Sequence, residues 1–384
     1  MRVAVVVRTL KIGGMEKVAV SLADAFAQCG HESHLIYFKD RDNVFVPDPK
    51  VTLHHFNLDR LMQMTIIGLV WELVARIINI VFRKSYFIWK GLFTSLLFKF
   101  MLHRVEKKAG KFDLIIIRGQ GTFEMLWPLK DRRIVQVCEN VLYSDARRAT
   151  PHAFYMSLIY NQKNIVCVSH IVEKSYREMQ KKYTLSNPSV KTITNPIDPV
   201  ETKRLSNAYT PGIDQPYIVS VGRIVPIKNI PLLIDAYAYA IKAFGLKHKL
   251  VIVGDGSDKA KVEEKIRRMG MQEKVLLTGF LKNPYPWMKE ADLFVLSSIS
   301  EGLGMVLLEA IVCGTKVVST DCDGVRDVMK GDLAGNLAKQ EAKDLANKIV
   351  SALDDNSIDY GKYLADFMPE TIVEKYIESY SQKR

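Results

Sequence analysis

Short apolar runs alternate with stretches of helical spacing along the first half of the chain. The first strand is predicted at residues 2–7 and is followed by a helix over residues 14–29. Further strands are predicted at residues 34–38, 51–56, 112–119, 132–140, 164–170 and 191–195, with a helix over residues 171–183. Because short buried strands joined by helices form parallel sheets covered on both faces, this half predicts a doubly wound α/β domain.

The alternation stops at residues 194–216, which are rich in Pro, Asn and Asp and predict a linker. It then restarts, with strands predicted at residues 217–224, 249–256, 274–280, 293–298 and 316–320 and helices at 230–245, 258–269 and 302–313. We therefore expect a first domain at 1–195 and a second doubly wound domain at 196–366. Residues 367–384 predict a final helix whose apolar stripe packs back on the first domain.

A basic and apolar segment at residues 61–110 interrupts the first domain. Ten basic and two acidic residues lie between Arg60 and Lys111, which is +8 of the net charge of +12. Polar residues recur there at intervals of four, three and four positions: Glu72, Arg76, Asn79 and Arg83. A polar stripe through the middle of a helix argues against a membrane span and favours a pair of helices lying in a bilayer interface.

The residues expected to contact an anionic membrane surface are aromatic and basic: Trp71, Arg76, Arg83, Lys84, Trp89 and Lys90. The alternative is a pair of ordinary core helices with solvated cations. Nucleic acid is not an expected partner, because the basic segment carries no helix-turn-helix, zinc-finger or RNP signature.

Composition narrows the class of protein. With 384 residues, of which 48% are hydrophobic, the chain is neither disordered nor fibrous. The five cysteines are scattered and form no metal-binding spacing, so we expect reduced thiols, a cytoplasmic protein and no cofactor. The apolar run after Arg2 is too short for a signal peptide and is predicted to be a strand.

Two cations follow the first strand of the second domain. Arg223 and Lys228 lie in the loop at residues 222–229, directly before a helix. At the carboxyl edge of a sheet they are suited to hold a diphosphate and to stabilise negative charge on a leaving phosphate. Solvated loop cations are the alternative.

Two carboxylates lie eight residues apart in the segment at 300–310. Glu309 falls in an apolar run of the predicted helix and needs a polar partner, while Glu301 precedes the helix. Facing a cleft, both can accept hydrogen bonds from sugar hydroxyls, and the N–H groups of Leu303 and Gly304 can face phosphate or sugar oxygens. An internal salt bridge of Glu309 is the alternative.

Gly13 and Gly14 follow the first strand and open a helix. Glycines at this point allow a phosphate to approach the backbone closely, although a plain strand-to-helix turn uses them equally well.

Taken in order, the early glycines, residues 222–229, 253–256 and 277–280, and the pair Glu301 and Glu309 resemble the retaining glycosyltransferases of family 4. The resemblance covers nearly the whole chain. It implies the GT-B fold, in which two Rossmann-like α/β domains face a central cleft.

The resemblance also implies roles for single residues. Arg223 and Lys228 would hold the donor diphosphate, Glu309 the ribose and Glu301 the transferred sugar. Backbone contacts to the donor would come from Gly13, Gly14, Phe280, Leu281, Leu303 and Gly304. Such enzymes are metal-independent, although the spacing of Asp321 and Asp323 keeps a metal pair open.

One position departs from the family pattern. Many relatives carry a His at the end of the fifth strand, where this chain has Glu139. A carboxylate there can accept a hydrogen bond from a hydroxyl but cannot act as a near-neutral imidazole.

The sequence as a whole predicts a retaining hexosyltransferase that uses a nucleotide diphosphate sugar, with UDP favoured. The expected acceptor is a lipid-linked glycan or lipopolysaccharide, at the inner face of the cell membrane in cell-envelope synthesis. A nucleotide-sugar 2-epimerase of the same architecture and a non-catalytic, nucleotide-sugar-binding scaffold are the alternatives.

Overall fold

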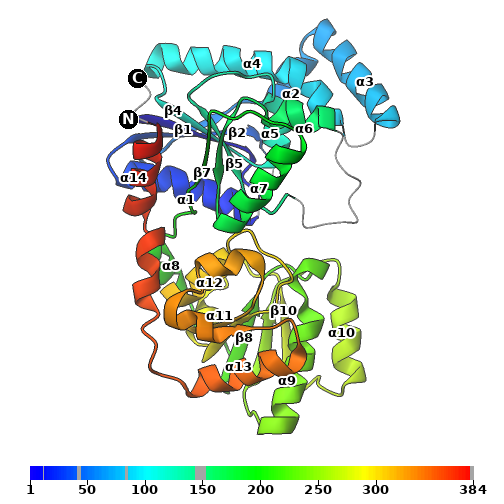
Figure 1. Ribbon diagram of the computed structural model, residues 1–384, viewed down its shortest axis with the longest axis vertical. Helices are drawn as coiled ribbons and strands as arrows, with labels where there is room; N and C mark the ends of the chain where they lie inside the picture. Colours follow the sequence, from blue (N-terminus) through cyan, green and yellow to red (C-terminus); the bar gives the residue numbers. More distant parts are fainter. Residues whose placement is uncertain (12, 41–44, 83–84, 143–152, 381–384) are drawn as a thin grey trace. The chain divides into compact units, whose positions relative to one another are not determined.

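A computed structural model describes the chain except for residues 12, 41–44, 83–84, 143–152 and 381–384. The chain forms two compact units, residues Met1–Pro196 with Pro369–Arg384, and residues Ile197–Met368 (Figure 1). Each unit contains a parallel sheet with helices packed on it, so the predicted pair of Rossmann-like α/β domains is confirmed.

The first unit is built on a seven-stranded sheet in the order β3-β2-β1-β4-β5-β6-β7. Its strands are β1 (Arg2–Thr9), β2 (Glu32–Lys39), β3 (Thr52–His55), β4 (Leu114–Arg118), β5 (Ile134–Cys138), β6 (Asn164–Cys167) and β7 (Ser189–Thr192). Every residue of β4 and of β5 is buried, as expected for central parallel strands that are covered on both faces.

The helices of the first unit are α1 (Gly14–Gln28), α2 (Leu58–Gln63), α3 (Ile66–Val81), α4 (Tyr86–Ala109), α5 (Gln120–Leu126), α6 (Ala153–Tyr160), α7 (His170–Lys182) and α14 (Pro369–Tyr380). The last of these comes from the end of the chain and packs on α1. The rings of Phe26 and Tyr376 lie 6.0 Å apart at this contact, and both side chains are buried.

The second unit has a six-stranded sheet in the order β10-β9-β8-β11-β12-β13. Its strands are β8 (Tyr217–Val221), β9 (Lys249–Val253), β10 (Val275–Gly279), β11 (Leu293–Leu296), β12 (Lys316–Thr320) and β13 (Leu337–Ala338). The α-helices are α8 (Pro199–Ser206), α9 (Ile230–Phe244), α10 (Lys259–Arg268), α11 (Tyr285–Lys289), α12 (Met305–Val312) and α13 (Ala342–Asp354). Short 3-10 helices complete it: η1 (Pro226–Lys228), η2 (Asp323–Asp327), η3 (Gly331–Asn336) and η4 (Gly361–Phe367).

Each sheet has one point at which the strand order reverses direction. It lies between β1 and β4 in the first unit and between β8 and β11 in the second. Open α/β sheets bind ligands beyond the carboxyl ends of the strands at such a point. The loops after these four strands are therefore where ligand-binding residues are expected.

The segment predicted as a linker contains a helix instead. Within residues 194–216, the side chain of Asp198 accepts a hydrogen bond from the backbone N–H of Glu201 at 2.9 Å and so caps α8. Pro199 at the first helical position has the fixed φ that a helix start requires. Pro and Asp thus mark the start of a helix here, where we had taken them as signs of a loop.

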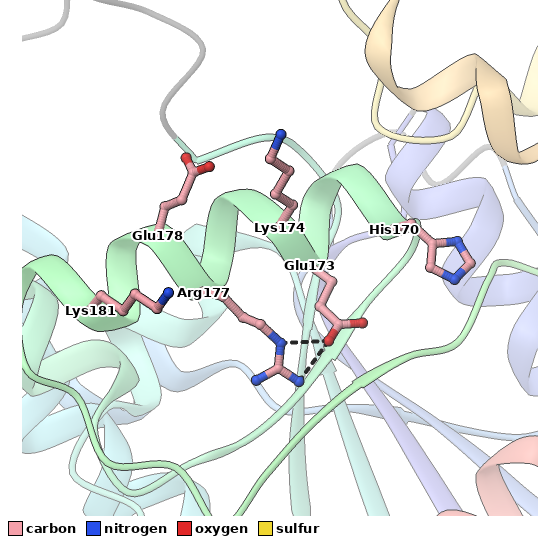
Figure 2. Close-up of a pocket in the computed structure, with 6 residues that line it drawn as sticks. All are labelled: His170, Glu173, Lys174, Arg177, Glu178 and Lys181. Carbon is pink, nitrogen blue, oxygen red and sulfur yellow. Dashed lines mark hydrogen bonds and ion pairs between the residues drawn. The ribbon is translucent and has the colours of Figure 1, made fainter.

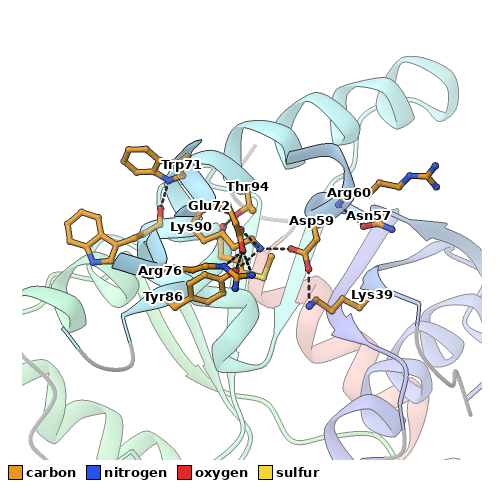
Figure 3. A network of polar contacts seen from close by, with 12 residues as sticks. Lys39, Asn57, Asp59, Arg60, Trp71, Glu72, Arg76, Tyr86, Lys90 and Thr94 are labelled. Atoms are coloured by element: carbon orange, nitrogen blue, oxygen red, sulfur yellow. Dashed lines mark hydrogen bonds and ion pairs between the residues drawn. The ribbon is translucent and has the colours of Figure 1, made fainter. Parts of the chain in front are cut away.

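Glu72, in the polar stripe of α3, faces the protein, contrary to the expectation that the polar side of this helix meets lipid. Glu72 and Lys90 are buried and their charged groups lie 2.9 Å apart (Figure 3). Lys90 also forms an ion pair with Asp59 at 2.8 Å. Its side chain is almost completely shielded from solvent, since it is only 4% exposed. The assignment of Lys90 to the membrane surface was therefore wrong, because its ammonium is held among buried carboxylates.

The other predicted membrane residues differ in exposure. Trp71 and Trp89 are half-buried, and the indole N–H of Trp71 donates to the carbonyl of Trp89 at 2.9 Å. Arg76 is exposed and pairs with Glu72 at 3.0 Å. The predicted residues Arg83 and Lys84 lie outside the described residues.

The outer face of α3 is apolar and exposed to solvent. Its exposed large side chains are Ile66, Ile67, Leu69, Val70, Leu73, Ile77, Ile80 and Val81. Among the described residues, no helix combines the length and the hydropathy needed to cross a bilayer. An exposed apolar face of this size marks an interaction surface.

Candidate functional site

The loop after β8 carries the two predicted cations. Gly222 has a φ of 159°, and Asn229 adopts the left-handed conformation between η1 and α9. The Arg223 side chain is exposed, and the described residues include no hydrogen-bond or ion-pair partner for it. Lys228 is half-buried at the end of η1. The loop therefore presents one free guanidinium and one anchored ammonium at the point where the strand order reverses.

Lys228 and Glu301 form a direct ion pair across this point. The Lys228 Nζ lies 2.6 Å from Glu301 Oε1, and the two side chains are only 20% and 14% exposed. Ser298, in the loop after β11, donates its hydroxyl to the same carboxylate oxygen at 2.5 Å. The structure thus brings together two predicted residues that lie 73 positions apart. The sequence did not predict Ser298 as a site residue, since a serine that follows a strand carries no pattern that indicates a function.

Two glycines allow the donor-side loops to pack closely. A Cβ on Gly254 would lie 1.9 Å from the carbonyl oxygen of Gly222, and a Cβ on Gly256 would lie 2.2 Å from that of Ile224. The backbone N–H of Ile224 also donates to the carbonyl of Asp255 at 2.9 Å. The glycines at 253–256 therefore support the Arg223 loop, a role that sequence analysis did not assign.

Glu309 lies half-buried on α12, and the hydroxyl of Tyr285 donates to its Oε1 at 3.1 Å. Gly304, with a φ of 78°, precedes the helix in the left-handed conformation, which favours glycine. No side chain caps this helix start, and Leu303 beside it is buried. The carboxylate and the free N–H groups at the helix start could hold hydroxyl and phosphate groups, respectively.

Phe280 and Leu281 follow β10 at the same edge of the sheet. Phe280 is 50% exposed and Leu281 is half-buried. A large apolar side chain left half in solvent at a sheet edge is available for contact with a ligand.

The two early glycines of the first unit differ in their surroundings. A Cβ on Gly13 would lie 2.2 Å from the Glu16 carboxylate, whereas a Cβ on Gly14 would meet nothing within 4 Å. The φ of Gly13 is 180°, which is extended backbone, and Gly14 is not among the residues with positive φ. Neither packing against described atoms nor backbone conformation thus explains glycine at position 14.

Glu139, after β5, forms an ion pair with Arg118, the last residue of β4. Arg118 is fully buried and also donates to Asn195 at 2.7 Å. The side chain of Glu139 is only 14% exposed. Its carboxylate therefore has a buried cationic partner, and the sequence offered no sign of it.

Asp321 has a basic partner as well. Its carboxylate accepts hydrogen bonds from Arg326 at 2.7 and 2.8 Å. Asp321 is one of the two aspartates whose spacing in the sequence allowed a metal site. Its carboxylate is instead bound to the guanidinium of Arg326.

A hollow lies on the surface of α7 (Figure 2). It is lined by His170, Glu173, Lys174, Arg177, Glu178 and Lys181. Arg177 and Glu173 form an ion pair at 2.7 Å within it. Because its lining comes from one face of a single helix, it is a surface feature and contains none of the predicted site residues.

Comparison with known proteins agrees with this geometry. The family model described as "Glycosyltransferase Family 4" matches residues 12–201, and the model described as "Glycosyl transferases group 1" matches residues 202–367. The boundary between the two matches falls close to the boundary between the two compact units.

Curated relatives include two glycosyltransferases of bacterial glycan synthesis. The chain is 30% identical over 216 residues to the N-acetylgalactosamine-N,N'-diacetylbacillosaminyl-diphospho-undecaprenol 4-alpha-N-acetylgalactosaminyltransferase of Campylobacter jejuni, covering 55% of this chain and 57% of that protein. It is 27% identical over 236 residues to the lipopolysaccharide core biosynthesis glycosyltransferase LpsE of Rhizobium meliloti, covering 59% and 67%. The match thus spans little more than half the length of the first relative.

Solved structures show the same fold. HepE of Anabaena, in complex with UDP and glucose, superimposes with a TM-score of 0.68 at 18% identity, covering 100% of both chains. TarM superimposes with a TM-score of 0.68 at 15% identity, covering 99% of this chain and 98% of that one. The two family matches, on two parallel-sheet domains, identify this chain as a glycosyltransferase of the GT-B fold.

Proposed function

We propose that the chain transfers a sugar, with retention of configuration, from a UDP-sugar to a lipid-linked glycan or lipopolysaccharide acceptor. The ion pair of Lys228 and Glu301, at the reversal point of the second sheet, is the observation that carries this proposal. The ammonium and the carboxylate lie 2.6 Å apart, and Lys228 shares its loop with the exposed Arg223.

The donor is bound by groups of opposite character. Arg223 and Lys228 bind the diphosphate, and the N–H groups at Leu303 and Gly304 add backbone donors. Glu309 accepts hydrogen bonds from the ribose, and Glu301 from a hydroxyl of the transferred sugar. Phe280 and Leu281 border the base. Complexes of HepE with UDP and with UDP-glucose support UDP as the nucleotide.

Transfer then proceeds on one face of the sugar. The bond between the anomeric carbon and the phosphate oxygen breaks, and UDP leaves with the electron pair. The acceptor hydroxyl forms the new bond from the same face, and its proton passes to the departing phosphate oxygen. The two cations stabilise the charge that develops on that oxygen, which is the largest effect a protein group supplies in such a step.

Glu139 has a positioning role in this proposal. Its carboxylate is held by the buried guanidinium of Arg118, so it is poorly placed to accept a proton. We propose that this ion pair fixes the ends of β4 and β5, which then lie beside the acceptor.

The acceptor is proposed from the relatives. The Campylobacter protein is named for a diphospho-undecaprenol substrate and the Rhizobium protein for lipopolysaccharide core synthesis. None of the five cysteines, all of them among the described residues, forms a disulfide bond, which fits the reducing cytoplasm and the inner face of the cell membrane.

Activity can be tested with purified protein, UDP-hexoses and UDP-N-acetylhexosamines, and an undecaprenyl-diphosphate-linked hexosamine. Transfer with an α-linked product, observed by NMR, is the expected result. Lys228→Ala and Glu301→Gln are each expected to lower kcat by about 100-fold to 1,000-fold. Lys242→Ala, on the exposed face of α9, is the matched control and should change nothing.

Three other outcomes would contradict the proposal. Failure to turn over any nucleotide sugar, with UDP still bound, indicates a non-catalytic scaffold. Release of UDP and epimerised sugar without acceptor indicates an epimerase. A β-linked product excludes retention from an α-linked donor.

The exposed face of α3 supports a peripheral membrane position. Ile66, Val70, Leu73, Ile77 and Ile80 follow one another at intervals of four and three residues, so they form one apolar stripe. The adjoining helix α4 exposes four basic side chains, Lys99, Arg104, Lys107 and Lys108. This combination fits an anionic bilayer, with the apolar stripe among the acyl chains and the cations among the headgroups.

Sedimentation with vesicles tests this position. Binding to phosphatidylglycerol vesicles is expected at low salt, with weaker binding to phosphatidylcholine. The double variant Leu73→Glu with Ile77→Glu should remove binding, whereas Val200→Glu, which changes an exposed apolar residue of α8, should retain it. Equal binding of all three proteins would refute the role of α3.

A further inference from the structure

The reversal point of the first sheet carries charged side chains that the donor site does not use. Arg8 lies near the end of β1, and Gln120 and Glu124 lie on α5, which begins directly after the neighbouring strand β4. Because ligands of open α/β sheets bind beyond the strand ends at this point, these three side chains are placed to meet one.

Arg8 is held in position, but the part of the chain that the structure describes offers it no polar partner. Its guanidinium carbon lies 4.4 Å from the ring centroid of Phe87, at the start of α4. Its side chain also passes close to Gly121, where a Cβ would be 3.5 Å from Nη1. Its Nε is buried without a hydrogen bond, and no described carboxylate forms an ion pair with it. An oriented guanidinium with unsatisfied donors is suited to receive a ligand oxygen.

Glu124 faces the same place with incomplete hydrogen bonding. Its Oε1 accepts one hydrogen bond, from the Gln120 amide at 3.1 Å. Burial raises the pKa of Glu124 to about 7, while the Gln120 hydrogen bond and the charge of Arg8 act in the opposite direction. Arg8 is thus near enough to influence Glu124, yet the two do not form an ion pair.

This separation has an energetic consequence. Opposite charges in a partly buried place normally close into a direct pair, because each otherwise loses hydration without compensation. Here the guanidinium rests on the Phe87 ring and the carboxyl on the Gln120 amide. A ligand that both accepts from Arg8 and donates to Glu124 would satisfy both groups. A sugar does so through its hydroxyls, whereas a phosphate has no proton to donate and would be repelled by the carboxylate.

We propose that Arg8, Gln120 and Glu124 form the subsite for the terminal sugar of the acceptor. Glu124 accepts a hydrogen bond from one hydroxyl, and Arg8 donates to a neighbouring oxygen of the same sugar. This inference rests on the proposed function, since it names the part of the acceptor that the first domain recognises.

Binding and turnover can be measured separately with two probes. The first is farnesyl diphosphate-linked N-acetylglucosamine and the second is farnesyl diphosphate without a sugar, each titrated into the whole protein by calorimetry. Arg8→Met and Glu124→Gln are each expected to weaken binding of the sugar-bearing probe by about 10-fold to 100-fold. Both should leave the Kd of UDP and of the sugar-free probe within about twofold. Glu178→Gln, an exposed carboxylate of α7, is the matched control.

The outcomes separate the two proposals. If the wild-type protein binds the sugar-bearing probe no better than the sugar-free one, or if neither variant weakens that binding, the subsite is refuted even where transfer occurs. If Arg8→Met weakens both probes equally, Arg8 binds phosphate and the assignment to sugar is wrong. If the variants weaken only the sugar-bearing probe but no protein transfers sugar, the subsite stands and the transferase proposal fails. Thermal unfolding of each variant shows whether the fold is retained.

Discussion

Replacing Lys90 with Met is expected to destabilise the first domain strongly. The ammonium of Lys90 lies 2.8 Å from Asp59 and 2.9 Å from Glu72, and it also donates to the Tyr86 hydroxyl at 3.1 Å. With Met, two partly buried carboxylates remain without their shared cation. Breaking a buried ion pair by removal of one partner costs about 3 to 5 kcal/mol. For a domain of this size that corresponds to a decrease in Tm of roughly 10 °C.

The loss should depend on pH in a defined direction. Burial by itself raises the pKa of Glu72 and of Asp59, but hydrogen bonds, including those from Lys90, hold each pKa below its ordinary value. A carboxyl with a lowered pKa stabilises the fold above its ordinary pKa, and this contribution is lost as the pH falls through the folded-state value. The difference between wild type and Lys90→Met is therefore fully present at pH 7. It should shrink below about pH 4, where the carboxyls become protonated.

Urea unfolding followed by tryptophan fluorescence at pH 7 and at about pH 3 measures this difference. Lys99→Met is the matched control, because Lys99 lies exposed on the same helix and should change stability by less than about 0.5 kcal/mol. A loss below about 1 kcal/mol for Lys90→Met at pH 7, or a loss of equal size at both pH values, would refute the reasoning.

Two further predictions concern the second domain. Gly254→Ala is expected to cost about 1 to 3 kcal/mol of stability and to weaken UDP binding, since the new Cβ would lie 1.9 Å from the Gly222 carbonyl oxygen. Gly212→Ala, which meets nothing within 4 Å, is its control, and equal effects in urea unfolding would contradict the packing argument. Tyr285→Phe removes the hydrogen bond to Glu309 and should weaken UDP binding by about fivefold, or roughly 1 kcal/mol, in calorimetry. An unchanged Kd would show that this hydroxyl does not orient the carboxylate.

Local patterns predicted the sheets of both domains well. The runs that became β1, β4, β8 and β11 are mostly apolar, because strands in a parallel sheet are buried on both faces. The segment before α8 was misjudged, because Pro and Asp occur both in loops and at helix starts. Only the hydrogen bond of the Asp198 side chain distinguishes the two cases.

The sequence predicted which residues make up the donor site but not how their side chains contact one another. The spacing of Glu301 and Glu309, and the cations at 223 and 228, pointed to a diphosphate and a sugar. That Lys228 pairs directly with Glu301 depends on β8 and β11 lying side by side in the sheet. Arg118 next to Glu139 likewise follows from the adjacency of β4 and β5.

The basic, apolar segment at residues 61–110 shows most clearly what the sequence alone determines and what depends on the tertiary structure. The sequence by itself determined two amphipathic helices, a polar stripe on the first and most of the net positive charge nearby, because helical period and charge are local properties. It could not determine which face of α3 turns inward. The tertiary structure decided this by placing Asp59 and Lys90 beside Glu72, so that Glu72 is buried within a compensated cluster and the apolar face is exposed. Burial of a charged side chain is unfavourable unless an oppositely charged group pairs with it, and here those groups come from other parts of the chain that the fold brings together.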